Sequence, residues 1–448
     1  MGNKLQLGYG RSKITPPLEK ELCGFGYYLG RKATGVHDDL YAYCLYFSHK
    51  GKDILLVNMD LIGLSTDMVA RIQNHLAACL FVEPDNVVLT STHTHTGPPT
   101  NVLVGCGEPN DEYLIRLPEL IAEAAVAARE DRREVRRICL GLGEATGLAR
   151  NREGGDFLDE HLYSVRVERV AAQTVTILHY ACHPIMNSCS EHVSADYPGY
   201  IIRALTEQGE LGCYINGLCG NINPLKCMPD TMGTPEKLYE DGALDRILGD
   251  FASAIQEAYI GSEYRDLPLS EIVGSGEAAG PADAGIFSVE FIRVAMPLRP
   301  QSPVDIDAIV AEESEKYGSE SAYLRVVRAW RDYQSDQIAT KRRAGEPIFI
   351  ENVGIYLLRL GSLILVTIPY EAFAEIAHEL RCRRPDLYWI VAGNAPNTYG
   401  YLPTRVAMGR HDGYGYESFG SSFLYRHLPF APEAAERLVE QIIAALDW

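Results

Sequence analysis

The sequence predicts an α/β fold in which mixed β-sheets are flanked by helices. Three observations lead to this prediction. Short apolar runs of strand length alternate with longer segments in which apolar residues recur every three to four positions. Residues 53–90 contain a complete strand–helix–strand pattern. The composition, with 46% hydrophobic and 23% charged residues, is that of a globular protein, and 448 residues are enough for a large core.

The first strand of this pattern covers residues 53–60, with the sequence DILLVNMD. Ser65 or Thr66 can cap the helix that follows, in which apolar side chains lie at positions 68, 69, 72, 76 and 80. The second strand covers residues 86–90. Since such units are right-handed and bring the ends of both strands to one edge of a sheet, the residues just after the strands should meet there.

Other apolar runs predict further strands. They cover residues 137–143, 163–170, 174–180, 353–360, 363–368 and 388–391. Residues 303–343 are predicted to be helical, and residues 433–446 form another amphipathic helix. The apolar stripe of the first of these segments, which we interpret as facing the core, consists of Tyr323, Leu324, Val327, Trp330 and Tyr333.

One domain is predicted to span residues 1–448, because the chain shows no repeat, no low-complexity tract and no linker. Residues 225–350 carry the most loop signals. We expect a helical and loop insertion in this segment, around the functional site.

Charge and composition restrict the partners. A formal net charge of -19 argues against a nucleic-acid-binding surface and leaves a small-molecule substrate as the expectation. The N-terminus lacks the apolar core of a secretion signal, and no run approaches the roughly 20 apolar residues of a membrane span. We therefore expect a cytoplasmic protein. The 11 cysteines form no C-x-x-C pair and are expected to be reduced, mostly buried thiols. A homo-oligomer is possible.

The stretch STHTHTGPP at residues 91–99 places two histidines on alternate positions after an apolar run. If the extended backbone continues, His93 and His95 point to the same side and share a small volume. Asp60, at the end of the first strand, is then expected on the same rim as His93. A metal site, a proton relay and an ordinary surface pair are all compatible with this pattern.

Three further candidate ligands follow apolar runs. His183 comes after the strand that ends near residue 180, Glu371 follows the run at 363–368, and Tyr401 lies in a turn-rich stretch. Nitrogen and oxygen ligands from separate strand ends, with one position left for water, are typical of catalytic zinc. Each residue taken alone also has a structural interpretation, namely a turn, a helix start or core packing.

Ten short motifs follow one another along nearly the whole chain. They are KITP at 13–16, GVHDDLY at 35–41, THTHTGP at 92–98, NR at 151–152, ACHP at 181–184, SADYPG at 194–199, GNINP at 220–224, PYE at 369–371, GY at 400–401 and YE at 416–417. In this order they resemble the catalytic domain of the neutral ceramidase family. The resemblance implies the fold of that domain and the hydrolysis of an amide.

The resemblance also implies one Zn²⁺ held by four side chains. The implied ligands are His93, His183, Glu371 and Tyr401. His95 resembles the family residue beside the metal-bound water, while Arg152 and Tyr416 resemble residues that hold the substrate carbonyl. These roles agree with general chemistry, because zinc lowers the pKa of water to about 7, imidazole transfers protons near neutral pH, and a guanidinium or phenol stabilises an oxyanion.

The chain departs from the family at Asn223, where the resemblance implies a serine. An amide side chain has no ionisable hydroxyl, so a covalent route through this position is excluded and attack by zinc-activated water remains. We also expect no counterpart of the C-terminal immunoglobulin-like domain of true ceramidases. We therefore expect a homologue of the catalytic domain that cleaves the linear amide of a small soluble substrate.

Three residues complete the predicted site as substrate contacts, namely His37, Asn151 and Asn223. Each of them, like Asp60, also has a structural interpretation, and Arg152 can instead pair with a carboxylate of this acidic chain. Two other functions stay open. The same centre can cleave an ester or a sugar linkage, or the protein can be an inactive homologue that binds a metal and a ligand.

Overall fold

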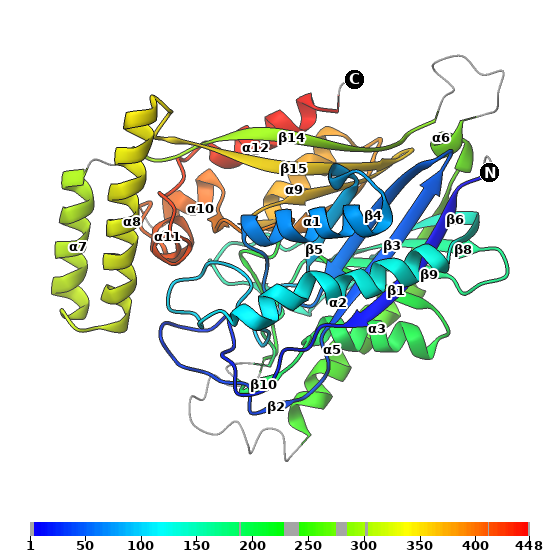
Figure 1. Ribbon diagram of the computed structural model, residues 1–448, viewed down its shortest axis with the longest axis horizontal. Helices are drawn as coiled ribbons and strands as arrows, with labels where there is room; N and C mark the ends of the chain where they lie inside the picture. The colour runs from blue at the N-terminus through cyan, green and yellow to red at the C-terminus, as the bar shows by residue number, and fades with distance from the viewer. Residues whose placement is uncertain are drawn as a thin grey trace.

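The computed structural model describes most of the chain. The described residues are 4–187, 190–227, 242–274, 285–300, 303–410 and 412–446. Two sheets packed against each other, with helices on their outer faces, make up this part of the molecule (Figure 1). The predicted α/β fold with mixed sheets is confirmed.

The first sheet has nine strands in the described residues, in the order β11-β9-β8-β6-β1-β3-β4-β5, with β13 also paired to β6. Its strands are β1 Gln6–Lys13, β3 Tyr41–His49, β4 Lys52–Met59, β5 Val87–Ser91, β6 Arg133–Glu144, β8 His161–Arg169, β9 Val175–Tyr180, β11 Leu211–Asn216 and β13 Glu263–Leu267. The β4/β5 and β9/β11 pairs are parallel and the others are antiparallel.

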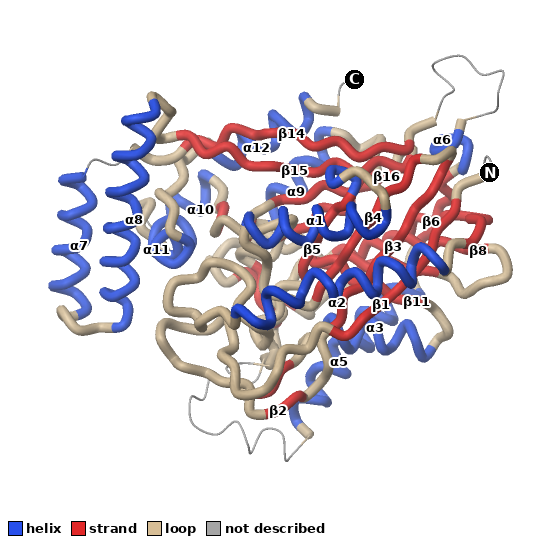
Figure 2. The backbone as a smooth tube through the Cα atoms, in the orientation of Figure 1, coloured by secondary structure: helices blue, strands red, loops and turns tan. Residues whose placement is uncertain are grey.

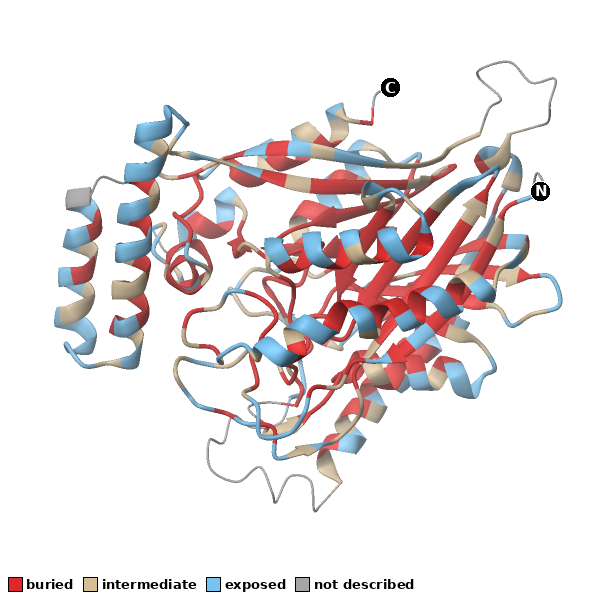
Figure 3. Ribbon diagram, viewed as in Figure 1, coloured by how far each residue is buried: buried red, intermediate tan, exposed pale blue. Residues whose placement is uncertain are grey.

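The second sheet has the order β14-β15-β16-β18. Its strands are β14 Phe287–Pro297, β15 Ile350–Leu360, β16 Leu363–Ile368 and β18 Tyr388–Gly393. The parallel pair β16/β18 is connected through helix α9 (Ala374–Arg383). Leu45 and Leu56 of the first sheet share one apolar core with Leu358 and Leu365 of the second. Figure 3 shows this interior as a band of buried residues between the layers.

Helices cover the outer faces. They are α1 Thr66–Leu80 and α2 Asp111–Glu130 over β1, β3 and β5; α3 Tyr197–Glu207 and α5 Ala243–Ile260 near β11, β6 and β8; and α12 Ala434–Ala444 near β14. Helices α7 (Pro303–Tyr317) and α8 (Ala322–Ala344) form a hairpin that stands at one end of the molecule, beside α11 (Figure 1).

The short elements lie mainly among the loops. They are β2 Gly35–Val36 paired with β10 His192–Val193, β7 Ala149–Asn151 with β12 Ile222–Pro224, β17 Glu371–Ala372 with β19 Tyr401–Leu402, and the short helices η1 Pro84–Asn86, α6 Leu269–Val273, α10 Arg405–Arg410, η3 Tyr416–Gly420 and α11 Ser421–Tyr425. Figure 2 shows long loops gathered beyond one end of the strands of the first sheet.

The predicted strand–helix–strand unit is present as β4, α1 and β5. Of the two candidate caps, Ser65 is the one that acts: its hydroxyl accepts a hydrogen bond from the amide of Met68 at 3.3 Å. Strand β5 starts one residue later than predicted because residues 84–86 form a 3₁₀ turn. The helical segment predicted at 303–343 is two helices, which a turn at 318–321 separates.

The remaining predictions concern the cysteines, membrane spans and domain organisation. The ten described cysteines are free thiols, and seven are buried. None of the described helices is both long and apolar enough to span a bilayer. The described parts of residues 225–350 supply α5 to the first sheet and β14 to the second. The single domain and the insertion in this segment stay predictions.

Helix α2 lies so close to β1 that two positions of the strand have room only for glycine. A Cβ atom on Gly10 would lie 2.1 Å from the carbonyl oxygen of Ala124, and one on Gly8 would lie 1.8 Å from that of Ala128. These contacts are with helix backbone, which cannot give way as a flexible side chain can. The glycines therefore fix the distance between helix and sheet.

We expect Gly10→Ala to lower the free energy of unfolding by about 1–3 kcal/mol, because the added methyl group forces helix and strand apart. Chemical denaturation followed by circular dichroism measures this change. Gly249→Ala in α5 is the control, since a Cβ there meets nothing within 4 Å and alanine favours a helix by up to about 1 kcal/mol. Equal stability of the two variants would contradict the close-packing argument.

Candidate metal centre

The predicted ligands come together where the loops of the two sheets meet. His93 follows β5 and His183 follows β9, both in the first sheet. Glu371 and Tyr401 come from the second half of the chain and face each other as partners in the β17/β19 ladder. The edge of the first sheet and the loop after β16 thus form the site together.

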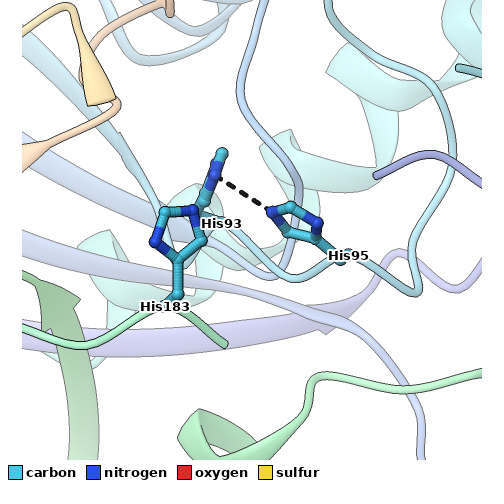
Figure 4. Close-up of side chains that lie close together, drawn as sticks. All are labelled: His93, His95 and His183. Carbon is cyan, nitrogen blue, oxygen red and sulfur yellow. Dashed lines mark hydrogen bonds between the residues drawn. The ribbon is translucent and has the colours of Figure 1, made fainter. Parts of the chain in front are cut away.

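Three histidine rings form the centre of this site. The nearest ring nitrogens of His93, His95 and His183 all lie within 4.8 Å of one another, a spacing that can hold a metal ion. The Nε2 atoms of His93 and His95 are 3.2 Å apart (Figure 4). His93 and His183 are buried, whereas His95 is half-buried.

The reason for the closeness of His93 and His95 differs from the one that the sequence predicts. Strand β5 ends at Ser91, and His93 has a φ of 71°, in the left-handed region that non-glycine residues rarely occupy. The extended backbone therefore does not continue through the two histidines. A turn, and not strand alternation, brings their rings together, so the predicted mechanism was wrong although the rings do meet.

Backbone carbonyl groups hold the outer nitrogen of each ring. The acceptors for the Nδ1 atoms of the three histidines are the oxygens of Ile62, Gly24 and Cys219, at 2.5, 2.7 and 2.7 Å respectively. A carbonyl accepts only from N–H, so Nδ1 of each ring carries a proton and Nε2 is the nitrogen turned to the centre. Metal-binding histidines are usually oriented in this way.

Two glycines permit these approaches. A Cβ on Gly24, which has a φ of 116°, would lie 2.6 Å from the His95 ring, and a Cβ on Gly220 would lie 2.2 Å from the carbonyl oxygen of Glu371. Any larger residue would displace the backbone that supports His95 and Glu371.

The carboxylate of Glu371 lies against this cluster and is 2% exposed. Its Oε2 atom is 2.9 Å from Nε2 of His183 and 3.3 Å from Nε2 of His93. Burial alone would raise the pKa of this carboxyl, but His93 and His183 together hold the pKa well below its ordinary value. Glu371 is therefore a buried negative charge.

Tyr401 lies beside this carboxylate. The Tyr401 ring stacks on that of His183, with ring centroids 6.5 Å apart. The guanidinium carbon of Arg152 lies 5.1 Å from the centroid of the Tyr401 ring. Burial raises the pKa of the Tyr401 phenol well above its ordinary value, while Arg152 opposes this shift and Glu371 adds to it. The phenol therefore lies beside the Glu371 carboxylate, and its raised pKa favours the neutral form.

Arg152 and Tyr416 lie on the more open side. The guanidinium of Arg152 is 6.0 Å from the Tyr416 ring centroid, and its Nη2 is 2.6 Å from a carboxylate oxygen of Glu417. The pairing that the sequence analysis left open is therefore present. Nε of Arg152 has no hydrogen-bond partner among the described residues. Tyr416 is 44% exposed.

Two of the predicted substrate contacts, His37 and Asn151, lie close to polar groups outside the histidine cluster. His37 Nε2 is 3.0 Å from the hydroxyl of Tyr200, and His37 is not one of the clustered histidines. The side chain of Asn151 bonds within its own loop, to the amide of Glu153 and the carbonyl of Phe157. Their roles as substrate contacts stay predictions.

Asn223 lies within a short strand near the site, and Asp60 directly follows strand β4. Asn223 lies in β12, opposite Arg150 of β7, and its buried Oδ1 atom has no hydrogen-bond partner within the described part of the chain. Asp60 is at the end of β4, where Oδ2 accepts from the amide of Tyr41 at 2.9 Å. Burial raises the pKa of Asp60 to about 8. The shared rim with His93 is present, because the loop after Asp60 bonds the His93 amide through Leu61.

Sequence reasoning missed Tyr425. This residue ends α11, and its hydroxyl donates a hydrogen bond to Oε1 of Glu371, the oxygen that does not face His183. Tyr425 belongs to no motif, and 54 positions separate it from its partner. Glu417 was part of a quoted motif but had no assigned role.

The donor set fits a metal ion. The Nε2 atoms of His93 and His95 face each other at 3.2 Å, and a cation beside them would be bound by their lone pairs. A buried carboxylate in contact with two of the rings likewise requires a positive charge. Imidazole nitrogens and carboxylate or phenol oxygens are ligands that zinc accepts.

Solved structures of other proteins are similar to this chain in fold. Neutral ceramidase from Pseudomonas aeruginosa matches with a TM-score of 0.71 and 16% identity, over 99% of this chain and 74% of that one. This chain has a neutral ceramidase-like fold. A ceramidase described as complexed with C2 matches with a TM-score of 0.66 and 16% identity, over 98% of this chain and 74% of that one. Neither a family model nor a curated protein matches the sequence.

The neutral ceramidase-like fold confirms the fold that the ordered motifs implied. At 16% identity the similarity concerns the backbone. The positions of the histidines, Glu371 and Tyr401 come from the geometry of this chain itself.

We expect Tyr425→Phe to weaken binding of Zn²⁺ by about 10-fold to 100-fold, because the phenol fixes the carboxylate of Glu371 from outside the ligand set. Competition with a chromophoric chelator measures this affinity. Tyr46→Phe is the matched control. The hydroxyl of Tyr46 donates a hydrogen bond to the carboxylate of Asp53 at 2.8 Å, so this variant removes a different bond between a phenol and a carboxylate. Equal affinities in the two variants would show that Tyr425 does not support the site.

Proposed function

We propose that the protein is a zinc-dependent hydrolase that cleaves the C–N bond of a small, soluble, linear amide. One observation carries the proposal: three imidazoles turn Nε2 toward one another beside the buried Glu371 carboxylate. The neutral ceramidase-like fold supports it, because the solved neighbours are named as ceramidases. The zinc, the amide and a cytoplasmic location belong to the proposal.

His93, His183, Glu371 and Tyr401 would hold the ion. When bound, Zn²⁺ supplies a Lewis acid and a lowered pKa for water, to about 7. Glu371 neutralises part of the charge of the ion, and the backbone bond of each Nδ1 keeps the rings of His93 and His183 in position.

His95 is assigned to proton transfer. It is more exposed than His93 or His183, and the carbonyl of Gly24 fixes the proton on Nδ1. Nε2 is then free to accept a proton from the attacking water and deliver it to the leaving amine. Burial and the two neighbouring imidazoles hold the pKa of His95 well below its ordinary value, so Nε2 is unprotonated at neutral pH.

Arg152 and Tyr416 are assigned to the substrate carbonyl. The Nε–H of Arg152 has no partner in the described residues, and the exposed Tyr416 ring lies beside the same guanidinium. Both groups can donate to the oxygen that becomes negative during hydrolysis. Asn223 cannot act as a nucleophile, so the proposed reaction has no covalent intermediate at that position.

We expect His93→Ala to lose zinc and turnover together, because it removes a ligand. His95→Gln is expected to keep one zinc per chain and to lose turnover by about 100-fold or more, because it removes the proton carrier. Metal analysis by plasma mass spectrometry, together with amide hydrolysis, measures both. Full zinc content in His93→Ala would contradict the proposed ligand set. Loss of zinc in His95→Gln would indicate that His95 is itself a ligand.

The bond is tested with a panel of N-acyl amino acids, N-acyl sugars, esters and a short-chain ceramide. We expect a small soluble N-acyl compound to give the highest kcat/KM, and removal of zinc with a chelator to abolish its turnover until zinc is restored. Preference for ceramide or for an ester would overturn the assigned substrate class. A zinc-loaded protein without turnover on the whole panel would favour a ligand-binding role.

A further inference from the structure

A row of tyrosines leads from the metal centre to the α7–α8 hairpin. The Tyr401 ring meets Tyr416 edge to face, with centroids 5.7 Å apart. A point at the Cβ position of Gly420 is 3.6 Å from both Cδ2 of Tyr416 and the hydroxyl of Tyr323. These two side chains therefore border the same glycine, and the row passes from η3 to α8.

The row continues on the hairpin. Tyr323, in the first turn of α8, lies 5.3 Å from Tyr27 and 4.8 Å from Tyr317, measured between ring centroids. Tyr27 belongs to the loop that also contains Gly24, whose carbonyl holds His95. Tyr317 is 46% exposed, and Tyr27 and Tyr323 are half-buried.

The hairpin is held firmly at this place. Arg325 lies 3.7 Å from the ring centroid of Tyr28, whose amide donates to the carbonyl of Gly105 at 2.5 Å. On its inner side, the buried Trp330 packs on Phe423 with centroids 4.7 Å apart, and its Nε1 donates to the carbonyl of His427. The tyrosines of the hairpin are thus fixed relative to the metal centre.

We propose that Tyr27 and Tyr323 form a specificity wall that binds a ring carried by the amide substrate, a sugar ring or an aromatic ring, while its amide lies at the metal centre. This inference rests on the proposed function. The rings of Tyr27 and Tyr323 are tilted by 53°, and those of Tyr317 and Tyr323 by 63°, so the tyrosines do not cover one another face to face. A tyrosine supplies a flat apolar face and a hydroxyl, which suits a ring with polar substituents.

Charge near the wall agrees with a polar ring. Arg152 and Glu417 form an ion pair beside Tyr416, and Arg325 lies over Tyr28. A long hydrocarbon chain would gain little from these groups, since it cannot form hydrogen bonds with them. The wall therefore favours small ring-bearing amides over lipid amides.

The experiment uses the full chain loaded with zinc and three acetylated probes, N-acetylglucosamine, N-acetylphenylalanine and unbranched N-acetyl aminohexanoate. We expect Tyr323→Ala and Tyr27→Ala to raise KM for a ring-bearing probe by roughly threefold to tenfold, the range for one aromatic contact. KM for the unbranched probe and the zinc content should stay unchanged. The two ring probes show whether the wall prefers the sugar or the aromatic ring.

Two controls keep the result specific. Tyr333→Ala removes another tyrosine of α8, 39% exposed, which lies near Arg426 and outside the row. Tyr323→Phe keeps the ring face and should keep most of the affinity. An equal rise of KM in Tyr333→Ala, or no rise in Tyr323→Ala and Tyr27→Ala, would overturn the wall.

Direct binding separates this inference from the proposed function. If no probe is hydrolysed, calorimetric titration of the same probes still gives Kd for the wild type and the variants. A weaker Kd for a ring probe in Tyr323→Ala would support the wall although the hydrolase assignment had failed. If the ring probes are hydrolysed but their Kd and KM are identical in the wild type and all variants, the hydrolase assignment stands and the specificity wall is refuted.

Discussion

One electrostatic constraint governs the site: a carboxylate that burial should neutralise stays charged. Glu371 is in contact with His183 and His93, and each of these imidazoles turns Nε2 to the same point because a backbone carbonyl holds its Nδ1 proton. A buried negative charge is unfavourable without a positive charge beside it. A positive charge at this point would therefore stabilise the arrangement of Glu371 and the two rings.

The two sheets depend on each other at this point. The histidines follow strands of the first sheet, whereas Glu371 lies just beyond β16 of the second, so the cluster closes only when the sheets are packed in register. Close contacts enforce the fit, such as that of Gly220 with the backbone of Glu371. Rigid support of this kind keeps ligands within a fraction of an ångström of their places. Packing of the core therefore determines whether the histidines and Glu371 meet.

Local sequence predicted what local physics determines. The apolar runs and the serine cap of α1 gave strands and a helix close to their observed bounds, and the ordered motifs implied the fold. Strand β1 was not predicted, because its Gly8 and Gly10 are typical of a loop and are needed only because α2 lies above them. The left-handed turn at His93 and the bond from Tyr425 to Glu371 were also out of reach, since both depend on distant parts of the chain.

Asn223 shows how a centre can keep its frame while one side chain changes. Residues 220–224 act mainly through their backbone: the carbonyl of Asn221 accepts from the amide of Arg152, and that of Ile222 accepts from the amide of His183, each at 2.9 Å. The amide of Gly220 donates to the carbonyl of Ala372, next to Glu371. None of these bonds involves the side chain at 223. Asparagine at 223, where the resemblance implies a serine, leaves these backbone supports of His183, Arg152 and Glu371 in place. The predicted ion site and the proposed carbonyl contact do not depend on this side chain, whereas a nucleophile at this position does.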